Sequence, residues 1–396
     1  MLKSEGAKAT WIGTTCIAAY VVNYYLRHVL SVLTPQMLEV GRFTVEQIAR
    51  LSSTYMLLYA AGQLVNGFLG DFLSPKKMVF FGLILAGVAT AAFPFIPHEL
   101  LQILCFAVFG FALSMTRGPL MKIISENTKP NHARLICVFF SFASFAGPLI
   151  ASVFALLNNW RNSFIAAGIV TFAVAVLAYV VITAMETRGM LQYQSTKGQG
   201  VSSILSVFKI EKFVFYMVIA CLVEIGAASI SQWIPTLLTD GFGFEKNAAN
   251  GLYSAIATVR SLMPFVALAI FRLTKERDVA MMRVTFLLAA VLFALLVIAP
   301  NRWIGLLLLS LALMAMSCTS ALLWSIYIPG LGKTGKVSSV NGVIDCTGYI
   351  AAALANLLFA SVMSNVGWNG VFCLWAGIGV IGFVSTLFVR QNKKGG

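Results

Sequence analysis

A series of long apolar segments is the feature that most limits what this chain can fold into. Twelve segments are close to 20 residues long, the length that an α-helix needs to cross about 30 Å of hydrocarbon. They lie near residues 11–38, 47–70, 78–96, 100–124, 134–157, 162–184, 212–238, 248–273, 280–299, 303–328, 337–362 and 368–390. Membrane β-barrels show shorter segments of alternating polarity, so the pattern excludes them. We therefore expect an all-α protein with twelve transmembrane helices.

The composition agrees with a membrane protein. The chain is 59% hydrophobic and 11% charged, whereas soluble proteins have about 25% charged residues. If the N-terminus is cytoplasmic, nineteen Lys and Arg residues fall in inner loops and tails and five in outer loops. This positive-inside bias predicts a multi-pass protein of the cell inner (plasma) membrane with both termini in the cytoplasm. The net charge of +14 thus reflects topology, and no basic run with interleaved aromatic residues suggests nucleic-acid binding.

We find no sequence pattern typical of a metal site, a disulfide framework or an enzyme active site. The seven cysteines all lie in predicted spans, and none has the spacing of a metal site or a disulfide framework. We see no nucleophile and base set and no glycine-rich phosphate loop, so we expect neither an enzyme nor a bound cofactor. The first residues, MLKSEGAKAT, lack a small-residue cleavage site, so we expect the first span to be retained.

The chain divides into two halves at a single long polar stretch. Residues 185–210 are rich in Gly, Ser, Thr, Gln and Lys, which predicts a cytoplasmic linker. It separates an N-terminal bundle of six spans, 1–184, from a C-terminal bundle of six spans, 211–396.

An internal repeat supports this division. Matching residues recur in the same order in both halves: Pro35 and Gly41 with Pro235 and Gly241, and later Trp160 and Phe164 with Trp368 and Phe372. Two pseudo-symmetric six-helix bundles are the plan of a transporter whose halves rock about a site at mid-membrane.

A polar stripe in the first span points to such a site. An arginine near the centre of a membrane helix costs about 3 kcal/mol or more, yet Arg27 lies there. Six polar residues follow one another at steps of three or four, which places them on one helix face: Tyr20, Asn23, Tyr24, Arg27, Ser31 and Thr34. Arg27 either pairs with a carboxylate or faces a ligand in a polar cavity. His28, 100° further round, either joins this site or faces a neighbouring helix.

Four more ionisable residues lie well away from the ends of predicted spans: Arg117, Glu224, Arg260 and Asp345. Arg27 and Arg117 share the N-terminal half, and no acid lies within the spans of that half. Arginine binds carboxylate or phosphate with two parallel hydrogen bonds, so these two arginines predict an anionic ligand. The alternative is that each pairs with an acid of the other half. Glu224 and Asp345 either balance an arginine or bind a proton, and Arg260 either pairs with one of these acids or contacts the ligand.

The loop after the second span resembles a signature of the major facilitator superfamily. Two glycines, an aspartate and a basic turn follow one another, namely Gly67, Gly70, Asp71, Lys76 and Lys77. The resemblance implies that the glycines allow helices 2 and 11 to approach and that Asp71, Lys76 and Lys77 act in gating. Asp71 would brace a neighbouring helix end in one state of the cycle. Phe72 replaces the basic residue that usually follows the aspartate.

Other motifs resemble the organophosphate:phosphate antiporter branch, which includes the glycerol-3-phosphate and hexose-6-phosphate transporters. The motifs are Tyr24-Tyr25-Leu26-Arg27-His28 with Pro35, Asp71 with Ser74-Pro75-Lys76, Trp233-Ile234-Pro235, and Gly348-Tyr349. The resemblance implies that Arg27 binds phosphate. The second phosphate-binding arginine of that family falls at Ala227, so recognition by two symmetric arginines does not carry over.

These observations predict a secondary active transporter that moves a small organic anion or phosphorylated metabolite by alternating access, with anion exchange as one mode. The expected substrate-binding residues are Arg27, Arg117, Tyr24, Asn23, His28 and Arg260. Glu224 and Asp345 are the expected coupling or proton sites. The alternatives are a proton-coupled symporter of a carboxylate or sugar acid, and a membrane sensor of a sugar phosphate. The expected partners are the substrate, the lipid bilayer, and protons or inorganic phosphate as coupling species, for a monomeric protein.

Overall fold

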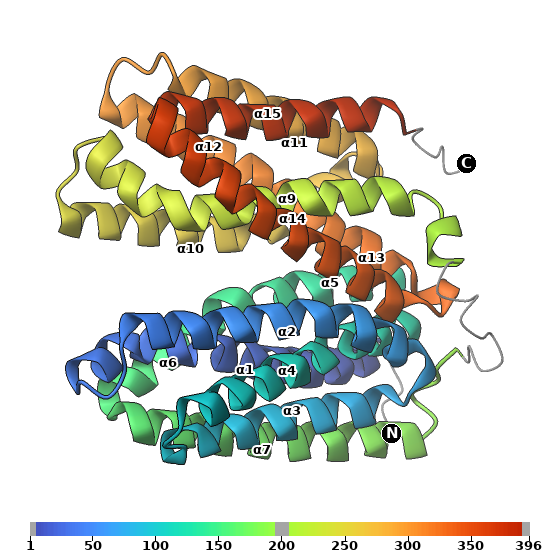
Figure 1. Ribbon diagram of the computed structural model, residues 1–396. Helices are drawn as coiled ribbons and strands as arrows, with labels where there is room; N and C mark the ends of the chain where they lie inside the picture. The colour runs from blue at the N-terminus through green and yellow to red at the C-terminus, as the bar shows by residue number, and fades with distance from the viewer. Residues whose placement is uncertain (1–4, 195–205, 390–396) are drawn as a thin grey trace. The chain divides into compact units, whose positions relative to one another are not determined.

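The structure, a computed structural model, describes residues 5–194 and 206–389. The middle of the predicted linker, 195–205, and the two chain ends lie outside the described residues. Every regular element in the described part is a helix, so the all-α prediction is confirmed (Figure 1). The N-terminal half contains α1 (Glu5–Glu39), α2 (Val45–Phe72), α3 (Pro75–Ala92), α4 (Glu99–Asn127), α5 (Pro130–Ser141), α6 (Ala143–Leu157) and α7 (Trp160–Thr187). The C-terminal half contains α9 (Phe213–Thr236), α10 (Lys246–Leu273), α11 (Asp278–Leu296), α12 (Arg302–Ala321), α13 (Ile328–Gly330), α14 (Val337–Val366) and α15 (Trp368–Leu387).

Eleven helical segments in the described residues are long and apolar enough to cross a membrane. They correspond to eleven of the twelve predicted spans. The remaining predicted span corresponds to α2, which has 28 residues but is not among the eleven. The helix buries Gln63, Asn66 and Asp71, so its polar side chains are covered by protein and its mean hydropathy is a poor guide to its depth in the membrane.

Two predicted spans are not single regular helices. The fifth is interrupted at Phe142, between α5 and α6, where the Phe142 amide bonds the carbonyls of Phe139 and Phe140. Pro148 lies one turn into α6 and cannot donate the next helical hydrogen bond, to the carbonyl of Ser144. The tenth span continues from α12 into a π-helical segment, Leu322–Tyr327.

The contacts of the chain group into two compact units. Unit 1 comprises residues 1–207 and 328–346, and unit 2 comprises 208–327 and 347–396. In unit 1, α1 packs on α6 and α7, α2 packs on α4, and α3 packs on α4 and α7. The α2–α4 crossing is close, because a Cβ atom on Gly110 would lie 2.4 Å from the carbonyl oxygen of Tyr55.

The segment 328–346 belongs to unit 1 by its contacts, although the predicted division assigns it to the C-terminal half. It contains α13 and the first ten residues of α14. Gly332 lies against the end of α4, where an added Cβ atom would be 2.0 Å from the Ser125 carbonyl oxygen. Gly342 of α14 lies against Gly67 of α2, and a Cβ atom on Gly67 would be 2.7 Å from the Gly342 Cα atom. The paired glycines therefore allow the backbones of α2 and α14 to touch.

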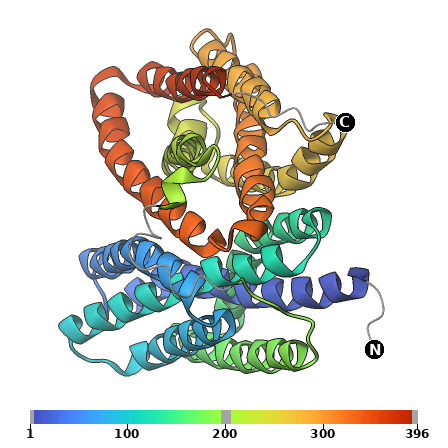
Figure 2. The same cartoon turned by 90° about the vertical axis from the view of Figure 1, so that its right-hand side faces the viewer.

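Unit 2 is built around contacts of α11 with α12 and α15. α10 packs on α12, and α9 contacts α10, α12 and α15. Figure 2 shows the yellow-green α9 lying among the orange and red helices of this unit. Gly379 and Gly382 of α15 bring that helix onto α11, since added Cβ atoms would lie 2.7 Å from the Ala290 amide nitrogen and 2.4 Å from the Phe286 ring.

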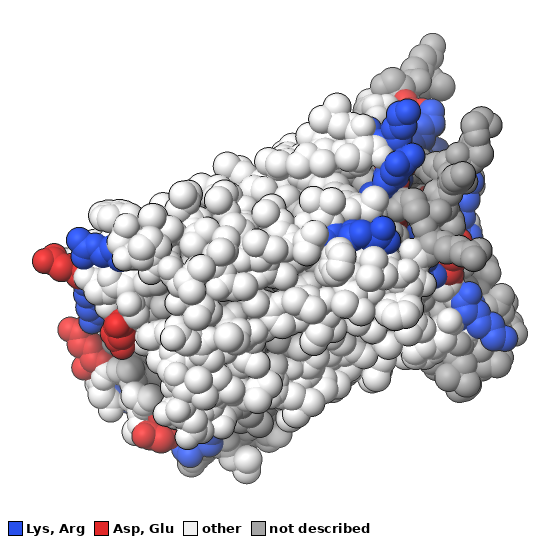
Figure 3. All heavy atoms as spheres, turned by 90° about the horizontal axis from the view of Figure 1, so that it is seen from above, with Lys and Arg blue, Asp and Glu red and all other residues white. Residues whose placement is uncertain are grey.

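Charged side chains gather at the ends of the helices. On the face drawn in Figure 3, the middle is free of charge, Lys and Arg gather mainly at one end, and Asp and Glu lie mainly at the other. The uncharged part carries many exposed apolar side chains, for example Leu104, Ile169 and Leu288. A surface of this kind is suited to contact with lipid.

Candidate functional site

Arg27 is held on α1 by aromatic residues of α1 and α2. Its Nε atom donates a hydrogen bond of 2.8 Å to the hydroxyl oxygen of Tyr55. The guanidinium carbon lies 4.8 Å from the ring centroid of Tyr24 and 4.7 Å from that of Tyr59. Contacts of this kind between a cation and a ring contribute about 0.5–2 kcal/mol each. The two rings and the hydroxyl therefore fix the orientation of the guanidinium within unit 1.

A cavity of about 260 Å³ adjoins Arg27 in unit 1. Its polar lining comes from α1, α2 and α3: Arg27, His28, Ser31, Thr34, Ser52, Tyr55 and Thr90. Phe106 and Phe109 of α4 and Phe164 of α7 close its apolar side. Many ligand pockets have this character, with apolar walls and a few polar groups, and Arg27 supplies the positive charge.

The other residues of the predicted stripe fall in two places. His28 lines the cavity, with its Nδ1 atom 2.9 Å from the Tyr24 carbonyl oxygen. Asn23 is fully buried against α4, where its Nδ2 atom lies 3.1 Å from the Leu113 carbonyl oxygen and 2.7 Å from Thr116 Oγ1. Asn23 does not line the cavity. Its hydrogen bonds join α1 to α4.

Arg117 forms an ion pair with Asp345. The Arg117 Nη1 and Asp345 Oδ1 atoms are 2.8 Å apart, and the two side chains are 13% and 1% exposed. Asn341, one turn earlier on α14, donates to the other carboxylate oxygen at 3.0 Å. Both partners belong to unit 1, because the first turns of α14 group with the N-terminal helices. For Arg117 the structure thus shows the alternative expectation: its partner is an acid 228 positions later in the chain, in the half that the sequence division calls C-terminal.

Tyr59 links the two arginines electrostatically. It stacks on Arg27 and also interacts with the charges of Arg117 and Asp345. The carboxylate of Asp345 interacts with both guanidiniums. Arg27, Arg117, Asp345 and Tyr59 thus lie within electrostatic range of one another, on α1, α4, α14 and α2, with Asp345 and Tyr59 buried and the two arginines half-buried. We call these four residues the charge cluster. A change of charge at one member acts on the others, because the protein interior screens weakly.

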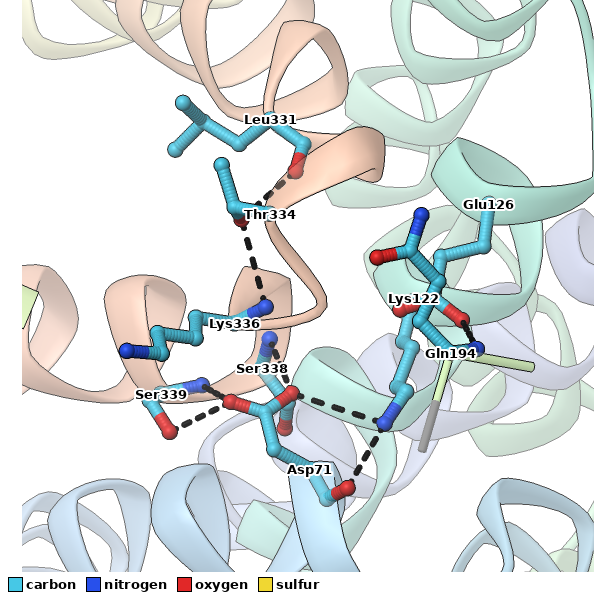
Figure 4. Close-up of polar contacts among 9 residues, drawn as sticks. All are labelled: Asp71, Lys122, Glu126, Gln194, Leu331, Thr334, Lys336, Ser338 and Ser339. Carbon is cyan, nitrogen blue, oxygen red and sulfur yellow. Dashed lines mark hydrogen bonds and ion pairs between the residues drawn. The ribbon is translucent and has the colours of Figure 1, made fainter. Parts of the chain in front are cut away.

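A second polar cluster lies where α2 ends and α14 begins (Figure 4). The Asp71 carboxylate accepts hydrogen bonds from the backbone amides of Ser338 at 3.1 Å and Ser339 at 2.9 Å, and from the Ser339 hydroxyl. These are the first amides of α14, which have no partner within their own helix. A carboxylate there also interacts favourably with the helix dipole. We call this contact of Asp71 with Ser338 and Ser339 the α2–α14 latch.

Lys122 of α4 completes the latch from the other side. Its Nζ atom donates to the Asp71 carbonyl oxygen at 2.8 Å and lies 3.8 Å from Asp71 Oδ1. Both side chains are 2% exposed. One turn further on, Glu126 accepts a 3.0 Å hydrogen bond from the Gln194 amide, which holds the start of the predicted linker against α4. The latch therefore carries a buried positive charge from α4 as well as the negative charge from α2.

The basic residues after Asp71 are Lys76 and Lys77, and Lys76 contacts α7. Lys76, at the start of α3, forms an ion pair with Glu186 near the end of α7 and lies 5.7 Å from the ring centroid of Tyr179. Lys77 is exposed. Lys76 therefore ties α3 to α7 inside unit 1.

Two of the predicted charges, Arg260 and Glu224, lie in unit 2. Arg260 of α10 donates from Nε to the hydroxyl of Ser317 on α12 at 3.2 Å. Of the two acids that were alternatives for Arg260, Asp345 is bound to Arg117. Glu224 of α9 lies against α14, where an added Cβ atom on Gly348 would be 2.7 Å from its Cγ atom.

The residues of these clusters that were not predicted include Tyr55, Tyr59 and Lys122. A signal was present for each. The two tyrosines are one turn apart in the second predicted span, so they share a helix face. Lys122 lies inside the fourth predicted span, five positions after Arg117, where a lysine is as costly as an arginine.

Comparison with known proteins places the fold in a family. The profile of the Major Facilitator Superfamily matches residues 16–353. The "Probable sulfoacetate transporter SauU" of Cupriavidus necator is 22% identical over 408 aligned residues, which cover 96% of this chain and 93% of that protein.

Two solved structures share the architecture. FucP in the outward conformation, a fucose:proton symporter of E. coli, has a TM-score of 0.77 at 14% identity, with 96% of this chain and 99% of that chain covered. The proton:xylose symporter XylE, bound to 6-bromo-6-deoxy-D-glucose, has a TM-score of 0.76 at 11% identity, with 98% and 97% covered. The matched profile covers most of the chain, and the all-helical fold agrees with it. The protein is a multi-pass membrane transporter of small organic substrates and belongs to the Major Facilitator Superfamily.

Proposed function

We propose that this protein carries a small organic anion across the membrane by alternating access, with Arg27 as the group that binds the anion. The observation that carries the proposal is the cavity beside Arg27, where one fixed cation is combined with hydroxyl groups and aromatic walls. Arginine presents donors that match a carboxylate, sulfonate or phosphate group. Tyr55 and the flanking rings leave the guanidinium little freedom, so binding would require little further ordering.

The size of the cavity favours a small metabolite. Its volume of about 260 Å³ is just below the range of roughly 300–1,000 Å³ typical of pockets for drug-sized ligands. The named activity of SauU concerns sulfoacetate, an anion with one sulfonate and one carboxylate group. We take sulfonated and carboxylated short-chain acids as the first substrate class to test, and phosphorylated metabolites of the organophosphate:phosphate antiporter branch as the second.

The second charged group of such a substrate would interact with the charge cluster, to which Arg27 belongs through its contact with Tyr59. In our proposal an anion bound at Arg27 competes with Asp345 for positive charge on Arg117, because the same cluster contains all three groups. Weakening the Arg117–Asp345 pair would loosen α14 from α4 and so couple binding to movement. Tyr24 and His28 would shape the site beside Arg27, and Asn23 would position α1. Arg260 stays a candidate ligand residue of unit 2.

Exchange and proton symport remain the two modes to separate. In the exchange mode, a counter-substrate such as inorganic phosphate restores the charge of the site on the return step. In the symport mode, a proton taken up by Asp345 frees Arg117 for the substrate. We favour Asp345 over Glu224 as the proton site, because the Asp345 carboxylate is bound directly to a candidate substrate arginine. The α2–α14 latch would open in one state of the cycle, with Lys76 and Lys77 supporting the adjacent turn.

Uptake of radiolabelled sulfoacetate, succinate and glycerol-3-phosphate into proteoliposomes tests the proposal. Arg27→Lys keeps the charge but loses the paired donors, and we expect the apparent KM to rise at least tenfold. Arg50→Lys is the matched control, since Arg50 is an exposed arginine of the same unit that pairs with Glu99. If the Arg27→Lys variant took up all three anions as the wild type does, Arg27 would be excluded as the binding group.

Uptake into the same proteoliposomes distinguishes exchange from proton symport. Uptake that requires internal counter-substrate and ignores a pH gradient indicates exchange. Uptake driven by a pH gradient and lost in Asp345→Asn, with counter-substrate exchange retained, indicates proton symport. Specific binding with no flux under any gradient would support the sensor hypothesis. We further propose two six-helix bundles, 1–184 and 211–396, joined by the cytoplasmic linker 185–210, in a monomer of the inner membrane with both termini in the cytoplasm.

A further inference from the structure

A long groove lies on unit 2, remote in sequence from the Arg27 cavity. It is formed by α10, α11 and α12 and has a volume of about 800 Å³. Almost all of its lining is apolar, including Ile270, Leu288 and Met314. Two cations, Lys275 and Arg277, lie at the end where the turn joins α10 to α11. The groove therefore combines an apolar channel with a positively charged mouth.

The length of the groove matches one leaflet of a bilayer. Along α11 its lining runs from Ala280 to Leu292, and along α10 and its C-cap from Met263 to Thr274. At a rise of 1.5 Å per residue, these stretches are about 17–18 Å long. Half of the roughly 30 Å hydrocarbon core is about 15 Å. An extended acyl chain that starts at Lys275 and Arg277 would thus fill the groove to the middle of the membrane.

The polar groups inside the groove are already bonded within the protein. The Thr285 hydroxyl lies 2.8 Å from that of Thr319 and donates to the Met282 carbonyl. The Thr274 hydroxyl donates to the Ile270 carbonyl at 2.9 Å. Neither hydroxyl needs a ligand, so the channel is suited to a hydrocarbon chain. Exposed Val284 and Leu288 form part of its wall.

The mouth of the groove is a strained turn. Lys275 and Glu276 have φ angles of 55° and 61°, a left-handed conformation that side chains other than glycine rarely adopt. The turn is closed by the amide of Glu276, which donates to the Phe271 carbonyl at 2.9 Å. Strain of this kind is often kept at binding sites. In the described part of the chain, neither Lys275 nor Arg277 pairs with a carboxylate, so their charges are available to an anion.

We propose that this groove binds an anionic phospholipid, with one acyl chain between α10, α11 and α12 and the phosphate on Lys275 and Arg277. The charge of the mouth selects an anionic headgroup, and the apolar channel selects a chain of leaflet length. Basic sites between membrane helices on the cytoplasmic side hold anionic lipid headgroups in this way. The positive-inside bias of the sequence places this turn in that leaflet.

Native mass spectrometry of the purified full-length protein tests the proposal, with dioleoyl-phosphatidylglycerol and dioleoyl-phosphatidylcholine as probes. We expect phosphatidylglycerol to bind more tightly than phosphatidylcholine. The double variant Lys275→Gln/Arg277→Gln should bind it about 30-fold more weakly, which corresponds to about 1 kcal/mol for each cation lost. Lys246→Gln/Arg302→Gln removes two cations at the opposite ends of α10 and α12, and should leave binding unchanged.

A second variant tests the channel separately from the charges. Val284 is 64% exposed on the groove wall, so Val284→Trp can fill the channel without disturbing the core. It should weaken binding of the dioleoyl lipid at least fivefold, and the dihexanoyl lipid should bind poorly to every variant. Equal binding of the two headgroups, equal binding of short and long chains, or a protein dimer that buries the face in place of lipid would each overturn the proposal.

Discussion

Replacing Asp345 with Asn should destabilise the protein more than replacing both members of its ion pair. The Asp345 side chain is 1% exposed and that of Arg117 is 13% exposed, with charged atoms 2.8 Å apart. Removing one partner of such a buried pair costs about 3–5 kcal/mol, because the remaining charge loses its counter-charge. Part of the hydrogen bond from Asn341, worth about 1.5–3 kcal/mol when its acceptor is charged, is lost as well. Replacing both partners by uncharged residues leaves no unpaired buried charge, and replacement by apolar residues of similar size is often close to neutral.

The measurement is a double-mutant cycle. Asp345→Asn, Arg117→Met and the double variant are unfolded reversibly in mixed micelles, and the free energies of unfolding are compared. We expect the double variant to be more stable than the sum of the single changes predicts, by about 2 kcal/mol or more. The Arg50–Glu99 pair is the matched control: its side chains are 54% and 35% exposed, so its coupling should be below about 1 kcal/mol. Additive effects for Arg117 and Asp345, or a coupling no larger than in the control, would refute our description of this pair.

Three further changes test other contacts. Gly342→Ala would put a Cβ atom 2.3 Å from the Gln63 carbonyl oxygen. It should lower the free energy of unfolding by about 1–3 kcal/mol, because α14 is forced away from α2. Gly251→Ala is the control for a thermal-shift measurement, since its added Cβ atom meets open space. Lys122→Met removes the buried cation of the α2–α14 latch and should slow transport, whereas Lys122→Arg should keep part of the rate. Equal transport rates for the wild type and Lys122→Met would show that Lys122 has no role in the transport cycle. Tyr55→Phe removes the hydroxyl that accepts from Arg27 Nε, a hydrogen bond worth about 1.5–3 kcal/mol. It should lower the thermal stability and raise the substrate KM roughly tenfold, and an unchanged KM would show that Tyr55 does not position Arg27 for binding.

The helices could be predicted because membrane crossing imposes a simple local rule. Each span must be apolar for about 20 residues, and the chain satisfies the rule in eleven helical segments, whereas α2 is long enough but is not among them. The break at Phe142 and the π-helical segment Leu322–Tyr327 were not predicted. Both depend on the hydrogen bonds of a few backbone groups, which hydropathy does not report.

The candidate site was predictable only in part, because its members meet through tertiary contacts. Periodicity placed Arg27 on a polar face, but it also placed Asn23 there, and Asn23 bonds α4. The pairing of Arg117 with Asp345 spans 228 positions, and no local pattern encodes such a contact. Lys122 was overlooked because lysine near a span end resembles an ordinary loop charge until its burial is seen.

The two sides of the α2–α14 latch differ in how strictly they require a particular side chain. Asp71 is recognised through backbone amides of Ser338 and Ser339, and every residue except proline supplies the same amide. A library of substitutions should therefore tolerate many residues at position 338 and few at position 71. At Arg117 and Asp345, by contrast, each side chain specifies the other, and paired replacements should rescue single ones. Two contacts of similar burial would then differ in such a library: position 71 would be restricted on its own, whereas positions 117 and 345 would be restricted as a pair.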